Sequence, residues 1–105
     1  MSDNWILACA TDDIEEEDLV RIDHADKTYC IYNTPKGFYA TDGICTHEEQ
    51  HLEDGLVTGT VIECPLHQGR FDVRSGKALS APVCVDLKTF PIQIYEGDIY
   101  VEIPD

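Results

Sequence analysis

The sequence contains few basic residues and no long apolar run. Of its 105 residues, 7 are lysine or arginine and 21 are aspartate or glutamate, so the formal net charge is −14. Such a charge disfavours binding to nucleic-acid phosphates and to anionic membranes, because both would repel the chain. No stretch approaches the length of a membrane-spanning helix or the apolar part of a secretory signal, which predicts a cytoplasmic protein without membrane association.

Helical periodicity longer than one turn is also lacking. Short apolar segments instead alternate with turn residues, and the 43% hydrophobic content argues for a folded chain. Hairpins are predicted across the turn at 33–37 and across Glu96-Gly97. Strands are predicted over residues 5–9, 19–23, 27–32, 37–41, 60–63, 90–95 and 98–103, with an extended segment over 82–87 and turns, including a link over 52–59, between them. Many short strands with regular turns predict one all-β domain, a sandwich or a barrel.

Two cysteine–histidine pairs carry the chemistry. They are Cys45-x-His47 and Cys64-x-x-His67, and sixteen residues separate His47 from Cys64. Each pair can place one thiolate and one imidazole on a tight loop. Two such loops could hold one Zn²⁺ through two cysteines and two histidines, as in a zinc-stabilised interaction domain. They could equally hold a [2Fe–2S] cluster, with cysteines on one iron and histidines on the other. The remaining interpretation, unrelated core cysteines and surface histidines, requires two pairs by coincidence.

The arrangement of the ligands favours iron–sulfur. Structural zinc sites usually carry like ligands on each loop, C-x₂₋₄-C and H-x₃₋₅-H, whereas each loop here carries one of each kind. Cys45-Thr46-His47 and Cys64-Pro65-Leu66-His67 match the C-x-H and C-x-x-H motif of the Rieske family. Over its whole length the chain resembles the small Rieske-type ferredoxins of bacterial aromatic-ring-hydroxylating dioxygenase systems.

This resemblance implies a fold, a cofactor and partners. The fold would be an antiparallel β-sandwich (Rieske/ISP-like), a single domain over residues 1–105 with a small cluster-binding subdomain inserted at about 42–80. The ligands of the [2Fe–2S] cluster would be Cys45, His47, Cys64 and His67. The protein would be a one-electron carrier and not an enzyme, accepting electrons from an NAD(P)H-dependent flavoprotein reductase and passing them to a terminal oxygenase. The alternative is a small Rieske subunit of another oxidoreductase, such as nitrite reductase.

Several residues outside the motif also receive a prediction. Cys9, Cys30 and Cys84 lie in apolar, strand-like segments and are predicted to be buried free thiols, since cytosolic cysteines stay reduced. His51 is predicted to lie near the rim of the cluster without being a ligand. Arg70 is predicted to pair with a carboxylate of the same chain.

The sequence departs from the respiratory branch of the family at positions that affect the redox potential. That branch has a disulfide between its ligand loops, whose cysteines would fall near Gln50 and at Leu66 here, and neither of these residues is cysteine. It also has serine and tyrosine hydroxyls that donate to the sulfurs, and here Gly69 and Phe71 replace them. Such donors stabilise the negative charge of the reduced cluster and raise the potential. We therefore predict a value near the lower end of the family range, around −150 mV.

Overall fold

The regular structure of the protein is almost entirely β. A computed structural model describes residues 4–46, 50–65, 69–80 and 85–104. None of the helical segments in these ranges has the length and apolar character needed to cross a membrane. The elements are β1 (Trp5–Ala10), η1 (Thr11–Asp13), β2 (Asp18–His24), β3 (Lys27–Thr34), β4 (Gly37–Asp42), η2 (Leu52–Asp54), β5 (Leu56–Thr58), β6 (Val61–Glu63), β7 (Arg70–Asp72), β8 (Thr89–Phe90), β9 (Ile92–Tyr95) and β10 (Asp98–Glu102).

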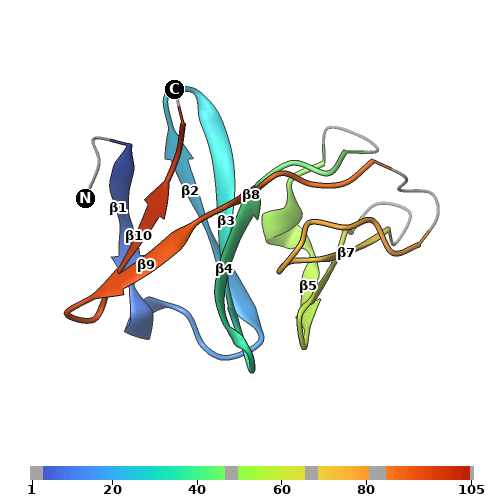
Figure 1. The fold of residues 1–105 in the computed structure, drawn as a ribbon. Coiled ribbons are helices and arrows are strands. Elements are labelled where there is room, and N and C mark those ends of the chain that lie inside the picture. Colours follow the sequence, from blue (N-terminus) through green and yellow to red (C-terminus); the bar gives the residue numbers. More distant parts are fainter. Residues whose placement is uncertain (1–3, 47–49, 66–68, 81–84, 105) are drawn as a thin grey trace.

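The strands form three antiparallel sheets. We call them the outer sheet (order β1-β10-β9), the middle sheet (β2-β3-β4-β8) and the small sheet (β5-β6-β7). Figure 1 shows the outer sheet at one end of the molecule, the middle sheet next to it, and the small sheet at the opposite end. The all-β antiparallel sandwich predicted from the sequence is therefore confirmed. The small sheet lies within the predicted insertion, whose limits near 42 and 80 stay a prediction.

Alternate residues of the middle sheet supply two separate cores. The cross-strand row Val20, Ile31 and Ala40 packs with the residues of the outer sheet. The neighbouring row, which includes Leu19 and Tyr32, packs with the residues of the small sheet. This division follows from the strand itself, because successive side chains point to opposite faces. The middle sheet thus forms a sandwich with the outer sheet and carries the small sheet on its other face.

The segment over residues 52–59 differs from its prediction as a plain link. It contains η2 and β5, and β5 pairs with β6 in a hairpin that places Thr58 opposite Val61. Gly59 lies in the turn of this hairpin with φ of +59°, a left-handed conformation that glycine adopts without steric cost. In the segment predicted to be extended over 82–87, residues 81–84 lie outside the described residues, and residues 85–88 form no strand.

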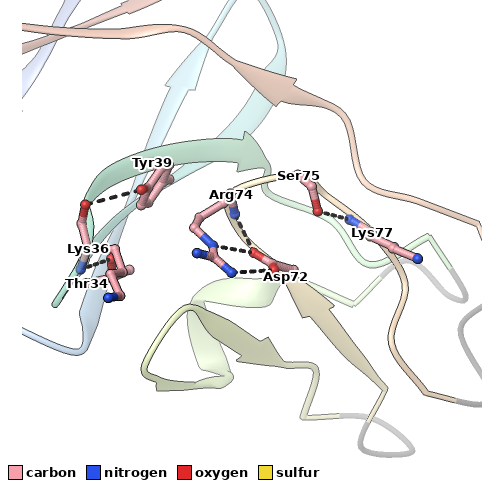
Figure 2. A network of polar contacts seen from close by, with 7 residues as sticks. All are labelled: Thr34, Lys36, Tyr39, Asp72, Arg74, Ser75 and Lys77. Carbon is pink, nitrogen blue, oxygen red and sulfur yellow. Dashed lines mark hydrogen bonds and ion pairs between the residues drawn. The ribbon is translucent and has the colours of Figure 1, made fainter.

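The turn after β7 is fixed by its own side chains. Asp72 accepts hydrogen bonds from the backbone N–H of Arg74 at 2.9 Å and from the Arg74 guanidinium at 3.2 Å. Ser75 accepts one from the backbone N–H of Lys77. Figure 2 shows this turn beside Tyr39 of β4, whose hydroxyl donates to the carbonyl of Lys36. The turn holds Val73, which is fully buried, in the core between the small and middle sheets.

Candidate metal centre

The first predicted ligand loop follows β4 and is closed by backbone hydrogen bonds. The N–H of Cys45 donates to the carbonyl of Gln50 at 2.9 Å, and the N–H of Leu52 donates to the carbonyl of Gly43 at 2.9 Å. Gly43 passes so close to β3 that a Cβ there would lie 2.5 Å from Cγ2 of Thr28. The loop therefore leaves the middle sheet at a point where only glycine fits, and it places Cys45 in a buried position.

The second predicted ligand loop joins β6 to β7. The N–H of Cys64 donates to the carbonyl of Gly69 at 2.7 Å, which closes the loop directly above the strand pair. At its base, Nε of Arg70 lies 2.9 Å from a carboxylate oxygen of Glu63, its cross-strand partner. The intramolecular pairing predicted for Arg70 is confirmed. Because this pair is partly exposed to solvent, its effect is mainly to fix the register of the hairpin.

The two loops bring their cysteines into one core. Cys45 is 4% exposed and Cys64 is 1% exposed, and both belong to the apolar cluster that includes Leu52, Ile62 and Phe71. Two thiols from separate loops in one water-poor site supply the cysteine half of a Rieske ligand set, so the residues present fit that cluster. His47 and His67 lie outside the described residues, and within those residues no group of three metal-ligating side chains gathers.

We call the end of the molecule that carries the two ligand loops and the small sheet the metal end. A segment from the C-terminal part of the chain crosses it. The hydroxyl of Thr46 donates to the carbonyl of Val85 at 2.6 Å, which ties the first loop to this segment. The N–H of Leu87 donates to the carbonyl of Gly76 at 2.7 Å, and the Leu87 side chain is buried in the same core as the cysteines. Gly76 has φ of +78°, and a Cβ there would collide with the carbonyl oxygen of Leu87. The sequence predicted that this segment is extended. It did not predict these contacts, because they join residues far apart in the chain, such as Thr46 and Val85.

Two polar contacts brace the metal end against the middle sheet. Nη1 of Arg21 on β2 lies 2.7 Å from Oε1 of Glu53 in η2. Glu17 accepts a hydrogen bond from the N–H of Gly59 in the β5–β6 turn at 2.8 Å. The acidic run at 15–18 is exposed, yet Glu17 within it makes this specific contact. Because both braces are exposed to solvent and screened, they orient the small sheet more than they stabilise it.

His51 lies at the end of the first loop, immediately before η2. A β-bridge pairs it with Ile44, and its Nδ1 is buried without a hydrogen bond among the described residues. On β2, the guanidinium of Arg21 holds the pKa of Asp23 below its ordinary value. That His51 is not a ligand stays a prediction.

The prediction that the remaining cysteines are buried free thiols is confirmed for Cys30 and holds only in part for Cys9. Cys30 is fully buried and free, and desolvation raises the pKa of its thiol to about 12. Cys9 is free and half-buried, and burial raises the pKa of its thiol. Cys84 lies outside the described residues. Tyr32, next to Cys30 on the same face of β3, shares a hydrogen bond of 2.8 Å with the hydroxyl of Thr41.

The comparison with known families decides the nature of the site. The model of the Rieske [2Fe–2S] domain matches residues 4–91, which include both cysteine–histidine pairs. The chain belongs to the Rieske family. Its cofactor is a [2Fe–2S] cluster, as predicted, which removes the zinc interpretation.

Relatives at high identity extend this assignment. The chain is 48% identical over 94 residues to the ferredoxin component of the naphthalene 1,2-dioxygenase/salicylate 5-hydroxylase systems of a Ralstonia species, covering 90% of each chain. It is 43% identical over 103 residues to the ferredoxin component of the naphthalene 1,2-dioxygenase system of Pseudomonas putida, covering 98% of this chain and 99% of that one. This Rieske protein is a ferredoxin, an electron carrier and not an enzyme.

Solved structures agree with the relatives. A chain in the complex of reduced oxygenase and oxidised ferredoxin of carbazole 1,9a-dioxygenase superposes with a TM-score of 0.91 at 34% identity, covering 96% of this chain and 94% of that one. A nitrite reductase small subunit from Mycobacterium tuberculosis superposes with a TM-score of 0.83 at 20% identity, covering 96% of each chain. The second likeness shows the fold alone, so the comparisons favour the ferredoxin over the alternative of a nitrite reductase subunit.

Proposed function

We propose that this Rieske ferredoxin passes single electrons from an NAD(P)H-dependent flavoprotein reductase to the terminal oxygenase of an aromatic-ring-hydroxylating dioxygenase system in the cytoplasm. The observation that carries the proposal is the pair of backbone-closed loops that bring Cys45 and Cys64 into one buried core. The names of the relatives support the dioxygenase system and its oxygenase. The free thiols of Cys9 and Cys30 support a reducing compartment.

The proposed ligands are Cys45 and Cys64 on one iron and His47 and His67 on the other. Cys45 and Cys64 lie at the matching ends of two loops, and each histidine follows its cysteine at the spacing of the family motif. When bound, the cluster supplies a one-electron couple whose potential is raised by its two neutral ligands. The packing of Leu52, Ile62 and Phe71 excludes water from the thiolate side.

The chain itself contributes a rigid and acidic frame. The Arg21–Glu53 and Glu17–Gly59 contacts orient η2 and the small sheet, which adjoin the ligand loops, against the middle sheet. A net charge of −14 steers the ferredoxin toward basic partner surfaces and speeds encounter at low salt. Glu48 and Glu49, which follow His47 in the sequence, are the proposed acidic contacts at the metal end.

Electron paramagnetic resonance of the dithionite-reduced protein tests the cofactor and its ligands. We expect a reduced [2Fe–2S] signal and about two iron and two sulfide per chain. Substituting His47→Ala or His67→Ala should abolish the signal, whereas His51→Ala should retain it. A signal that survives His47→Ala but is lost in His51→Ala would show that the histidine assignment is wrong.

A reconstituted electron-transfer assay tests the function. The ferredoxin should support NAD(P)H-driven turnover by the reductase and oxygenase of its host, with a rate limited by the ferredoxin at low concentration. This rate should fall as ionic strength rises, because the Debye length shortens from about 30 Å at 0.01 M salt to about 8 Å at 0.15 M. Transfer to a nitrite reductase of the host, without transfer to the oxygenase, would establish the alternative function.

A further inference from the structure

Residues 85–88, which we call the strap, are bonded at both ends to the chain around the first ligand loop. The carbonyl of Val85 accepts a hydrogen bond from the hydroxyl of Thr46 at 2.6 Å, and the carbonyl of Lys88 accepts one from the N–H of Asp42 at 3.0 Å. Figure 1 shows the strap entering β8 from the end of the molecule that carries β5 and β7. Since Asp42 precedes the first ligand loop and Thr46 lies within it, these bonds fix the strap to that loop.

The middle of the strap is bonded to the turn after β7. The N–H of Ala78 donates to Oδ1 of Asp86 at 2.9 Å, and the N–H of Leu87 donates to the carbonyl of Gly76 at 2.7 Å. This turn runs back along β7, because Ala78 forms a β-bridge with Phe71. Since β7 begins directly after the second ligand loop, these two bonds fix the strap to the chain that leads out of that loop.

The strap therefore joins the two ligand loops. Each of its four residues makes one of these hydrogen bonds. Its Leu87 side chain is also buried in the core that contains Cys45 and Cys64. Because the ligands of one [2Fe–2S] cluster come from both loops, the separation of the loops has to match the cluster. A segment that is bonded to both loops and packed in the core of their cysteines can fix this separation.

Asp86 differs from the rest of the strap in the group that it uses. The other three residues bond through backbone N–H or carbonyl groups, whereas Asp86 accepts through its carboxylate. An ionised acceptor makes a stronger hydrogen bond than a neutral carbonyl does. Its donor, Ala78, packs against the core that contains both cysteines. The carboxylate therefore acts directly beside that core, and a substitution can remove it without changing the backbone of the strap.

We propose that Asp86 is a positioning residue for the [2Fe–2S] cluster. Its carboxylate fastens the strap to the turn after β7, and the fastened strap holds the two ligand loops at the separation that the cluster needs. The proposal rests on the function and the ligands proposed above, because Asp86 acts on those ligands and replaces none of them. Contacts of this kind outside a ligand set orient the ligands, and their loss typically lowers the affinity for a metal by about 10–100-fold.

Two variants of Asp86 and a matched control test the proposal in the holoprotein. Asp86→Ala removes the acceptor, whereas Asp86→Asn removes the charge and keeps Oδ1 as an acceptor. Asp13→Ala is the control, because Oδ2 of Asp13 in η1 accepts from the N–H of Ala10 at 3.0 Å, compared with 2.9 Å for the bond of Asp86. Asp86→Ala should speed the loss of iron to a chelator by about tenfold or more, while Asp86→Asn and Asp13→Ala should change it by less than about twofold.

Two further readouts separate positioning from a general loss of stability. The electron paramagnetic resonance signal of dithionite-reduced Asp86→Ala should be broadened, because loops that are held less firmly give a spread of ligand geometries. Asp86→Asn should restore the wild-type line shape. In hydrogen exchange, the amide of Ala78 should lose protection in Asp86→Ala, whereas the amides of β1 and β10 keep it.

The comparison of the two variants decides the result even if Asp86→Ala assembles no cluster. A normal cluster in Asp86→Asn then supports the proposal, and equal loss in both variants overturns it. A folded Asp86→Ala with faster exchange at Ala78, but with wild-type line shape and iron loss, would also overturn it. A wild type that carries the cluster but does not reduce the oxygenase would instead overturn the proposed function and leave the role of Asp86 standing.

Discussion

The two ends of this ferredoxin are built in different ways. At one end, which we call the outer end, the outer sheet packs on one face of the middle sheet, whose strands are long, such as β3 with eight residues, and together they fill a continuous apolar core. At the metal end, β5, β6 and β7 have three residues each, and polar contacts such as Arg21–Glu53 and Thr46–Val85 hold the loops. Three short strands bury little area, so the metal end depends on its cofactor in a way that the outer end does not.

Loss of the cluster should have the largest effect. It should unfold the metal end while the outer end stays folded. Cys45→Ser or Cys64→Ser should abolish cluster assembly, because each removes one of the two cysteine ligands. In hydrogen exchange, amides between residues 43 and 79 should then lose protection, while those of β1–β4, β9 and β10 keep it. Cys9→Ser is the matched control and should keep both cluster and protection. Uniform loss across the whole domain would contradict this division.

Core substitutions at the two ends should differ in how their effect on the free energy of unfolding depends on the cluster. Leu52 at the metal end and Ile99 in the outer sheet are both fully buried. In the holoprotein, Leu52→Ala and Ile99→Ala should each lower the free energy of unfolding by about 2–5 kcal/mol. In the apoprotein, Ile99→Ala should retain its effect and Leu52→Ala should lose most of its own, because its surroundings are already open. Urea unfolding of both forms measures this, and equal effects of Leu52→Ala in the two forms would count against it.

The sequence predicted the strands of the outer end and the ligand motif better than the polar contacts that join the metal end to the middle sheet. Period-two alternation identified the hairpin of β9 and β10, and the cysteine–histidine spacing identified the candidate ligands. In β3 the run from Tyr29 to Tyr32 is apolar throughout because the strand is buried on both faces, and alternation cannot show this. In the small sheet, β5 was not predicted, because its three residues lie between Gly55 and Gly59 in a segment that the glycines mark as a link. The Arg21–Glu53 contact joins residues 32 positions apart, so no local pattern indicates it.

The redox potential should respond to a change at the metal end and not at the outer end. Phe71 is fully buried in the core that contains both cysteines. Phe71→Tyr should supply a donor toward a sulfur, worth about 1.5–3 kcal/mol, and raise the potential by roughly 60–130 mV from a wild-type value near −150 mV. Gly69→Ser should also raise it. Phe90→Tyr is the control, since Phe90 packs against Tyr29 on the opposite face of the middle sheet. Protein-film voltammetry measures these values, and a wild-type potential above about +100 mV would refute the low-potential assignment.

Alkaline pH should give the smallest effect, and it should arise at the boundary between the two ends. Cys30 and Tyr32 lie on the face of β3 that points to the metal end. Burial raises the pKa of Cys30 to about 12 and holds the pKa of Tyr32 well above its ordinary value. In the unfolded chain a cysteine ionises near pH 8.5 and a tyrosine near pH 10, so above these values the unfolded state binds fewer protons than the folded one. The stability contributed by the neutral groups is therefore complete below about pH 8.5 and is lost progressively as the pH rises toward 12.

Each group should contribute a slope of at most about 1.4 kcal/mol per pH unit within its own window. Urea unfolding at pH 8, 9, 10 and 11 measures the slope in the wild type and in Cys30→Ala and Tyr32→Phe. Cys30→Ala should flatten the slope from about pH 8.5 and Tyr32→Phe only from about pH 10, because the two groups titrate at different values in the unfolded state. Tyr95→Phe removes the hydroxyl of an exposed ring in the outer sheet and should leave the slope unchanged. A slope that falls with Tyr95→Phe but not with Cys30→Ala would move the alkaline sensitivity to the outer end and contradict the assignment to β3.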